Sequence, residues 1–269
     1  MAFRIETTRT ACLACCLTLA ALIGGSAAGA QTAEPAPAAP LSKACQAGAS
    51  TSAEESPLPN VAAALAQRKS LRILAMGAAP GRVSARGGYT ALIEAMMERA
   101  LKGIAIVMIN RGVSGELAAN AATRMKNEVA LDNPDLVLWQ VGTNDALAYV
   151  PAGEFAATVK DQIAWLKAHK VDVVLVGLQF AKEMLRDAHY AEIRESLRQL
   201  AAQENVIVVR FYEAMQIINQ EQGSAPEPVS EAFARDEAGY NCLAQYVARA
   251  ITLGVFAKNM PAPKPPQQK

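Results

Sequence analysis

The groups of this chain that could do chemistry follow its apolar runs. The run LRILAM (71–76) leads into a glycine turn, where an α/β enzyme often presents its first catalytic group. That turn presents Ala78 and Ala79, whose methyl groups can neither attack a substrate nor transfer a proton. Polar side chains follow two later runs: Ser114, Asn144 and Asp145. These are a hydroxyl, an amide and a carboxylate, which can donate or accept hydrogen bonds.

Five short apolar runs must position these groups, and they alternate with amphipathic stretches of helical length. The runs are rich in Val, Ile and Leu: LRILAM (71–76), IAIVMI (104–109), DLVLWQV (135–141), VDVVLVGL (171–178) and NVIVVRF (205–211). Nearly continuous apolar runs are typical of strands buried on both faces of a parallel sheet. The sequence therefore predicts an α/β fold, a doubly wound five-stranded parallel sheet flanked by helices. Ligands of such sheets bind beyond the carboxyl ends of the strands.

The turns after the first four runs resemble, in their order, the SGNH (GDSL-type) hydrolase family. They read GAAPGR, NRGVSGE, GTNDA and QFAKE. The resemblance covers residues 71–253 and is closest to a bacterial exported branch of the family. The motifs of that branch, QVGTND and GY.CLA, match Gln140–Asp145 and Gly239–Ala244. The resemblance implies an SGNH hydrolase (flavodoxin-like) fold and the hydrolysis of carboxylic esters.

The same resemblance implies roles for three residues. The backbone N–H of Gly115 and the side-chain amide of Asn144 correspond to the oxyanion hole, whose donors stabilise the charge that develops during acyl transfer. Gly115 has no side chain to block the approach of its N–H group. Asp145 is expected to cap the following helix or to orient the loop. GTND also fits an ordinary strand-to-helix turn, because Gly, Asn and Asp are common turn and cap residues.

The catalytic pair of the family is missing from the matching positions. The position of the serine nucleophile falls on Ala79. Counting back from Gly239, the position of the histidine base falls on Ala234, and that of the acid that orients the base falls on Glu231. Because nucleophile and base are both replaced by alanine, we expect the acyl-transfer chemistry to be lost.

A relocated nucleophile is the alternative, and Ser84 and Ser114 are its candidates. The chain has two histidines. His169 is expected at the opposite edge of the sheet, as the cationic end of a helix. His189 is expected at the start of the next helix, where it would need hydrogen-bond reach to a serine to act as a base. Glu231 and Asp236 could also act as bases, but neither has a serine at a recognisable spacing.

The N-terminus predicts export. Arg4 and Arg9 precede an apolar run over residues 11–25, and Ala28-Gly29-Ala30 follows it. A charged region, an apolar region and an A-x-A site together indicate a signal peptide over residues 1–30, cleaved near Ala30, and a periplasmic or secreted protein. The alternative is a membrane anchor, but the run is shorter than the roughly 20 apolar residues of a spanning helix. We therefore expect no integral membrane span in the mature chain.

The mature chain is expected to have three parts: an Ala/Pro-rich arm (31–65), an SGNH-type α/β domain (66–257) and a disordered tail (258–269). It keeps Cys45 and Cys242. An isolated pair in an exported protein suggests a disulfide that ties the arm to the last helix. Two unrelated thiols are the alternative, because spacing alone does not give connectivity.

Composition and motifs argue against several classes of partner. The net charge of +1 and the scattered basic residues do not suggest a nucleic-acid partner. Two distant histidines leave no metal-ligand cluster. The turn GAAPG does not match the G-x-G-x-x-G loop of dinucleotide-binding proteins, so no cofactor is expected.

The sequence thus predicts an exported protein of SGNH type with a degenerate site. It is expected to bind an acyl ester, a glycan or a similar small molecule in the crevice without hydrolysing it. The alternative is an active esterase that uses Ser84 or Ser114.

Overall fold

The computed structural model describes residues 40–51, 56–77, 88–223 and 237–257. The chain divides into two units, Met1–Glu34 and Pro35–Lys269, and all described residues belong to the second. Among these residues, none of the helices combines the length and the apolar character that crossing a bilayer requires.

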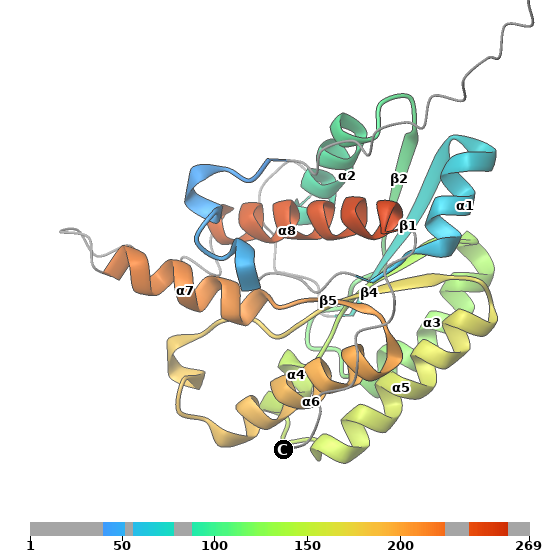
Figure 1. Ribbon diagram of the computed structural model, residues 1–269. Coiled ribbons are helices and arrows are strands. Elements are labelled where there is room, and N and C mark those ends of the chain that lie inside the picture. The colour runs from blue at the N-terminus through green and yellow to red at the C-terminus, as the bar shows by residue number, and fades with distance from the viewer. Residues whose placement is uncertain (1–39, 52–55, 78–87, 224–236, 258–269) are drawn as a thin grey trace, which may run out of the picture. The chain divides into compact units, whose positions relative to one another are not determined.

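A parallel sheet forms the centre of the second unit (Figure 1). Its strands are β1 (Ser70–Gly77), β2 (Ala105–Asn110), β3 (Leu136–Gln140), β4 (Asp172–Val176) and β5 (Ile207–Val209), in the order β2-β1-β3-β4-β5. The prediction of a doubly wound five-stranded parallel sheet is therefore confirmed. The chain moves outward from β1 to β2 and then returns across β1 to β3. The carboxyl ends of β1 and β3 thus form the switch point at which such sheets bind ligands.

The helices cover both faces of the sheet. They are α1 (Pro59–Arg68), α2 (Gly88–Ala100), α3 (Ala118–Asp132), α4 (Thr143–Leu147), α5 (Ala152–Ala168), α6 (Ala188–Glu204), α7 (Phe211–Gly223) and α8 (Glu237–Phe256), with short 3-10 turns at η1 (Lys43–Cys45), η2 (Ala49–Thr51) and η3 (Lys182–Met184). Helices α1, α2 and α8 lie on one face, and α3, α5 and α6 lie on the other (Figure 1). This covering explains the continuous apolar runs, because every residue of β3 and β4 is buried.

Helix α5 shows how the amphipathic stretches pack. Phe155, Val159, Ile163 and Leu166 recur at helical spacing, and all four side chains are almost fully buried. Burying a side chain of this size contributes about 1.5–3 kcal/mol. The helix therefore gains most of its stability from one apolar stripe.

A buried carboxylate from the sheet caps α1. The residue before this helix, Leu58, has no side-chain acceptor. Instead, Asp172 at the start of β4 accepts hydrogen bonds from the backbone N–H groups of Asn60 and Val61, both at 2.9 Å. Burial raises the pKa of Asp172, and these donors oppose that shift. The expected boundary between arm and domain, after residue 65, lies inside α1.

The predicted disulfide between Cys45 and Cys242 is confirmed, with a Cα–Cα distance of 5.4 Å. It joins η1 to α8, and hydrogen bonds strengthen the contact. The hydroxyl of Tyr246 donates to the carbonyl of Cys45 (2.7 Å), and the N–H of Ser42 donates to Oε1 of Gln245 (2.6 Å). Residues well before α1 are therefore fixed to the last helix.

Candidate functional site

Two turns meet at the carboxyl edge of the sheet, and the first follows β2. Its backbone continues beside β1, since the N–H of Arg111 donates to Ala75 (2.8 Å) and that of Val113 to Gly77 (2.9 Å). Gly115 follows in this turn with φ at +78°. Within the described part of the chain, apart from its own chain neighbours, no heavy atom lies within 4 Å of the place that a Cβ would occupy there. A glycine thus suits the backbone conformation of this turn.

The second turn carries Asn144, and its amide joins the two turns. Nδ2 of Asn144 donates to the backbone carbonyl of Glu116 at 2.9 Å. Glu116 directly follows Gly115, so the structure brings together the two residues expected to form an oxyanion hole. A side-chain amide carries two N–H donors, and only one of them is used in this bond. The second can serve a ligand.

Asp145 links the second turn to the helix that follows the first turn. Its side chain is 2% exposed, and Oδ1 accepts a hydrogen bond from the N–H of Ala118 at 2.9 Å. Ala118 is the first residue of α3, whose preceding residue Leu117 offers no capping side chain. The expectation was a cap of the following helix or an orienting role in the loop. The carboxylate in fact bonds the start of the preceding helix, which adjoins the Gly115 turn.

We expect the substitution Asp145→Ala to lower the free energy of unfolding by about 1–2 kcal/mol, because the buried N–H of Ala118 loses its acceptor. Asp145→Asn keeps an acceptor oxygen and should cost less. Urea unfolding of both variants measures the difference, and equal losses would contradict this role.

The difference in unfolding free energy between the wild type and Asp145→Asn should depend on pH, because the Asp145 carboxyl titrates. Burial raises the pKa of this carboxyl above its usual value near 3.8. The folded protein then keeps a proton that the unfolded chain has already lost. The stability of the wild type relative to Asp145→Asn should therefore fall as pH rises through the window between the unfolded and folded pKa values. A constant difference across that window would count against the raised pKa.

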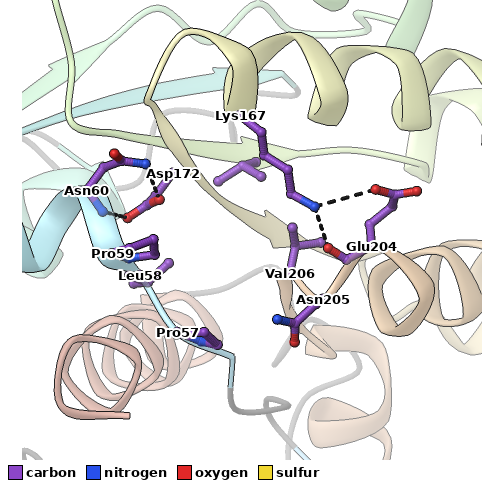
Figure 2. Close-up of a pocket in the computed structure, with 10 residues that line it drawn as sticks. Pro57, Leu58, Pro59, Asn60, Lys167, Asp172, Glu204, Asn205 and Val206 are labelled. Carbon is purple, nitrogen blue, oxygen red and sulfur yellow. Dashed lines mark hydrogen bonds and ion pairs between the residues drawn. The ribbon is translucent and has the colours of Figure 1, made fainter. Parts of the chain in front are cut away.

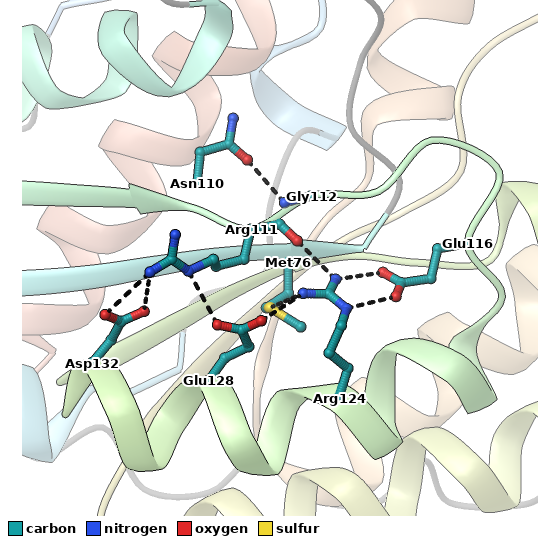
Figure 3. A network of polar contacts seen from close by, with 8 residues as sticks. All are labelled: Met76, Asn110, Arg111, Gly112, Glu116, Arg124, Glu128 and Asp132. Atoms are coloured by element: carbon teal, nitrogen blue, oxygen red, sulfur yellow. Dashed lines mark hydrogen bonds and ion pairs between the residues drawn. The ribbon is translucent and has the colours of Figure 1, made fainter.

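An ion network holds the Gly115 turn against α3 (Figure 3). The guanidinium of Arg124 binds both carboxylate oxygens of Glu116, at 3.0 and 2.9 Å, and donates to the carbonyl of Arg111 at 2.7 Å. Arg124 also pairs with Glu128 at 3.1 Å. Glu116 is thus fixed at two points: Arg124 of α3 binds its side chain, and Asn144 donates to its backbone carbonyl. These bonds raise the pKa of Arg124, with the Glu116 hydrogen bond as the main cause.

Sequence reasoning did not single out this network. The spacing of Arg124 and Glu128 suggests an ion pair on a helix, but this spacing does not indicate Glu116 as a partner. In the sequence, Glu116 is only the last residue of the turn NRGVSGE. Bidentate pairing of arginine with carboxylate fixes geometry as well as charge, so the network is a positioning device for Gly115.

Gln140 is a second residue that the sequence reading passed over. It ends β3 beside Gly77 of β1, at the switch point. A Cβ on Gly77 would lie 1.9 Å from the Gln140 carbonyl, so this close approach requires glycine. The Gln140 side chain is 1% exposed, and within the described part of the chain neither amide atom has a hydrogen-bond partner. An unpaired buried amide costs about 1–3 kcal/mol. The sequence signal for Gln140 is a polar residue near the end of the apolar run 135–141.

The positions expected for catalysis lie outside the described residues. These are Ala78, Ala79, Ser84, Glu231, Ala234 and Asp236. Ser114 is described and exposed. Among the described residues, its hydroxyl has no hydrogen bond to a carboxylate or an imidazole, so no base activates it there.

The two histidines lie on opposite edges of the sheet. His169 follows α5 as its C-terminal cap, as the sequence predicts, and stacks on Trp165 at 3.9 Å between ring centroids. His189 is the second residue of α6, at the same edge as Asn144. Its Nδ1 lies 3.3 Å from the Glu192 carboxylate and its ring stacks on Tyr149.

A separate pocket of about 310 Å³ lies at the amino edge of the sheet (Figure 2). Its charged groups are already paired, because Asp172 bonds Asn60 and Lys167 bonds Glu204. This edge is opposite the turns described above. Among the described residues, no group of three or more His, Cys, Asp or Glu side chains is arranged to hold a metal ion.

Comparison with known proteins agrees with the fold. The model of the non-GDSL lipase-like family matches residues 44–257. No curated protein sequence matches the chain.

Several solved structures share the fold. TesA is 18% identical with a TM-score of 0.53, over 68% of this chain and 97% of its own. The acetyl xylan esterase AlAXEase is 18% identical with a TM-score of 0.55, over 67% and 100%. Axe2, an acetylxylan esterase from Geobacillus stearothermophilus, is 17% identical with a TM-score of 0.54, over 68% and 94%. At these identities the likeness shows the fold alone.

Proposed function

Because the chain belongs to the non-GDSL lipase-like family, we propose that it is an exported SGNH-type protein that binds an acyl ester or a glycan without hydrolysing it. One observation carries this proposal. The donors at Gly115 and Asn144 are held together by the Glu116 carbonyl, whereas the positions matching the nucleophile and the base are Ala79 and Ala234.

The retained donors suit a carbonyl oxygen. Backbone N–H and amide N–H groups fixed in advance bind a polarised oxygen without reorganising. A catalytic cycle needs in addition a nucleophile and a base within hydrogen-bond reach of each other. An oxyanion site without them gives a residual rate only about a thousandfold above water. Such a site binds ligands far better than it turns them over.

The second candidate function is ester hydrolysis by a relocated serine. The position of Ser114 favours it, because this exposed residue directly precedes Gly115. Two observations argue against it: among the described residues the Ser114 hydroxyl has no hydrogen bond to a carboxylate or an imidazole, and the imidazole of His189 instead contacts Glu192 and Tyr149. Ser84 is the other candidate, and it lies outside the described residues.

Export is part of the proposal, with a signal peptide over residues 1–30 and a periplasmic or secreted mature protein. The disulfide between Cys45 and Cys242 supports an oxidising compartment. The mature chain would consist of the arm, the α/β domain from residue 66 to 257, and the tail.

The direct test measures hydrolysis of aryl esters, from acetate to octanoate, by the purified processed protein. A serine-reactive phosphonate probe is applied alongside, and an active SGNH esterase serves as the positive control. We expect no turnover above the buffer blank and no labelled serine. Turnover together with labelling of a single serine would overturn the proposal and would identify the relocated nucleophile.

A further inference from the structure

Tyr149 stands at the carboxyl edge of the sheet in an unusual state. It follows α4 with φ at +54°, a left-handed conformation that costs energy for a residue with a side chain. Its side chain is nevertheless exposed to 67%, so burial of the ring does not offset this cost. Glycine would suit the backbone better at this position. The backbone conformation therefore has a cost that the position of the ring does not offset, and the ring itself remains accessible to a ligand.

The ring is held in place from one side. It stacks on the imidazole of His189, with 5.3 Å between centroids and 14° between planes. Its hydroxyl lies 3.5 Å from Oδ2 of Asp187, the residue that caps α6. Since one face covers the imidazole and most of the ring remains accessible, the opposite face is open to solvent. Tyr149 and His189 together form a stacked pair, which we call the ring platform.

The ring platform lies at the same edge of the sheet as the donors of the candidate site. Tyr149 follows Asn144 by five residues, and between them the N–H of Ala148 donates to the Asn144 carbonyl at 2.8 Å. The hydroxyl of Tyr190 in α6 donates to the Gln179 carbonyl at 2.7 Å. The N–H of Gln179 donates in turn to the Thr143 hydroxyl at 3.0 Å. The platform and Asn144 are therefore parts of one connected edge.

We propose that the ring platform is a subsite for a pyranose ring of the ligand; this inference rests on the proposed function and names the ligand class of the same site. An aromatic face carries negative charge density and attracts polarised C–H groups. The C–H face of a pyranose presents such groups to a flat ring. The carboxylates of Asp187 and Glu192 flank the platform, and carboxylates accept hydrogen bonds from hydroxyls. These carboxylates already contact Tyr149, Tyr190 and His189, and their remaining lone pairs suit sugar hydroxyls, which a bare acyl chain or aryl ring does not offer.

This arrangement places a sugar beside a carbonyl-binding pair. A glycan that carries an ester could lay one ring on Tyr149 and direct its acyl carbonyl toward Asn144 and Gly115. Leu147, the last residue of α4, and Leu185, which follows η3, are also exposed.

The test is calorimetric titration of the full processed protein with xylotetraose and with chitotetraose, and with phenyl butyrate as the sugar-free probe. We expect at least one tetrasaccharide to bind more tightly than phenyl butyrate. Tyr149→Ala should weaken that binding by roughly tenfold, from lost stacking and lost contact area. Tyr149→Phe keeps the stacked ring and should bind within about threefold of the wild type.

Two controls keep the test decisive. Tyr149→Gly removes the ring at a backbone position that suits glycine, so it should fold and still lose the sugar. Leu131→Ala, at an exposed position on α3, should leave binding unchanged. Binding of neither tetrasaccharide, or equal binding by Tyr149→Gly and the wild type, would overturn the ring platform. Ester turnover with a labelled serine would overturn the proposed function instead, so the two failures are distinguishable.

Discussion

The double variant Ala79→Ser with Ala234→His is expected to hydrolyse short-chain aryl esters at least about 100-fold faster than the wild type. In serine hydrolases, removing either the nucleophile or the base costs up to about a millionfold in rate, and the groups act as a unit. Each single variant should therefore stay at the level of the wild type. Steady-state rates with an aryl acetate measure the effect. A folded double variant that is no faster than the wild type would contradict the assignment of both positions.

A third change ties the restored rate to the site described here. Asn144→Ala in the double variant should reduce the rate by about 100- to 1000-fold, the usual cost of losing one oxyanion donor. Asn120→Ala is the matched control, because Asn120 is an exposed amide on α3. If both substitutions had the same small effect, the new activity would arise elsewhere on the protein.

The sheet could be predicted from the sequence because its signal is local and repeated. Each of the five apolar runs overlaps one strand, with ends that differ by at most two residues, and each strand ends close to the expected turn. Burial on both faces requires continuous apolar residues, so the pattern and the architecture have one physical cause. The order β2-β1-β3-β4-β5 does not follow from this pattern, because right-handed crossovers through helices are compatible with several orders of parallel strands.

The support of the site could not be predicted in the same way, because it depends on contacts between distant residues. Asp145 accepts from Ala118, and Arg124 binds Glu116 across a turn. Neither bond follows from local spacing, since each joins different elements. Gly115 and Asn144 were predicted from motifs, whereas the carbonyl that joins them belongs to Glu116, a residue without any motif of its own.

The ring platform failed to stand out for a related reason. In the sequence, Tyr149 and His189 are isolated aromatic residues in different segments. In the sequence, His189 suggests only a base, because histidine is the common proton carrier near neutral pH. The stacking and the positive φ of Tyr149 become visible only when the two turns are folded side by side.

The disulfide predicts the largest change in stability. Replacing Cys45 and Cys242 together with alanine is expected to lower the free energy of unfolding by about 2–5 kcal/mol. The bond closes a loop between residues 197 apart, and a crosslink across a long loop removes the most freedom from the unfolded chain. Loss of this constraint should lower Tm by roughly 5–15 °C for a chain of this size. Calorimetry of the oxidised wild type and the alanine pair measures the difference.

Comparing the alanine pair with the reduced wild type separates the effect of the crosslink from the effect of the buried sulfur atoms. Both cysteines are 1% exposed, so part of any loss comes from the removed sulfur atoms rather than from the crosslink. The wild type under a reducing agent keeps the sulfurs and loses only the bond, so its Tm should fall most of the way toward that of the alanine pair. The hydrogen bonds from Tyr246 to Cys45 and from Gln245 to Ser42 would then hold η1 on α8 unaided. Equal Tm values for oxidised and reduced wild type would show that these contacts alone suffice, and that the crosslink adds no stability.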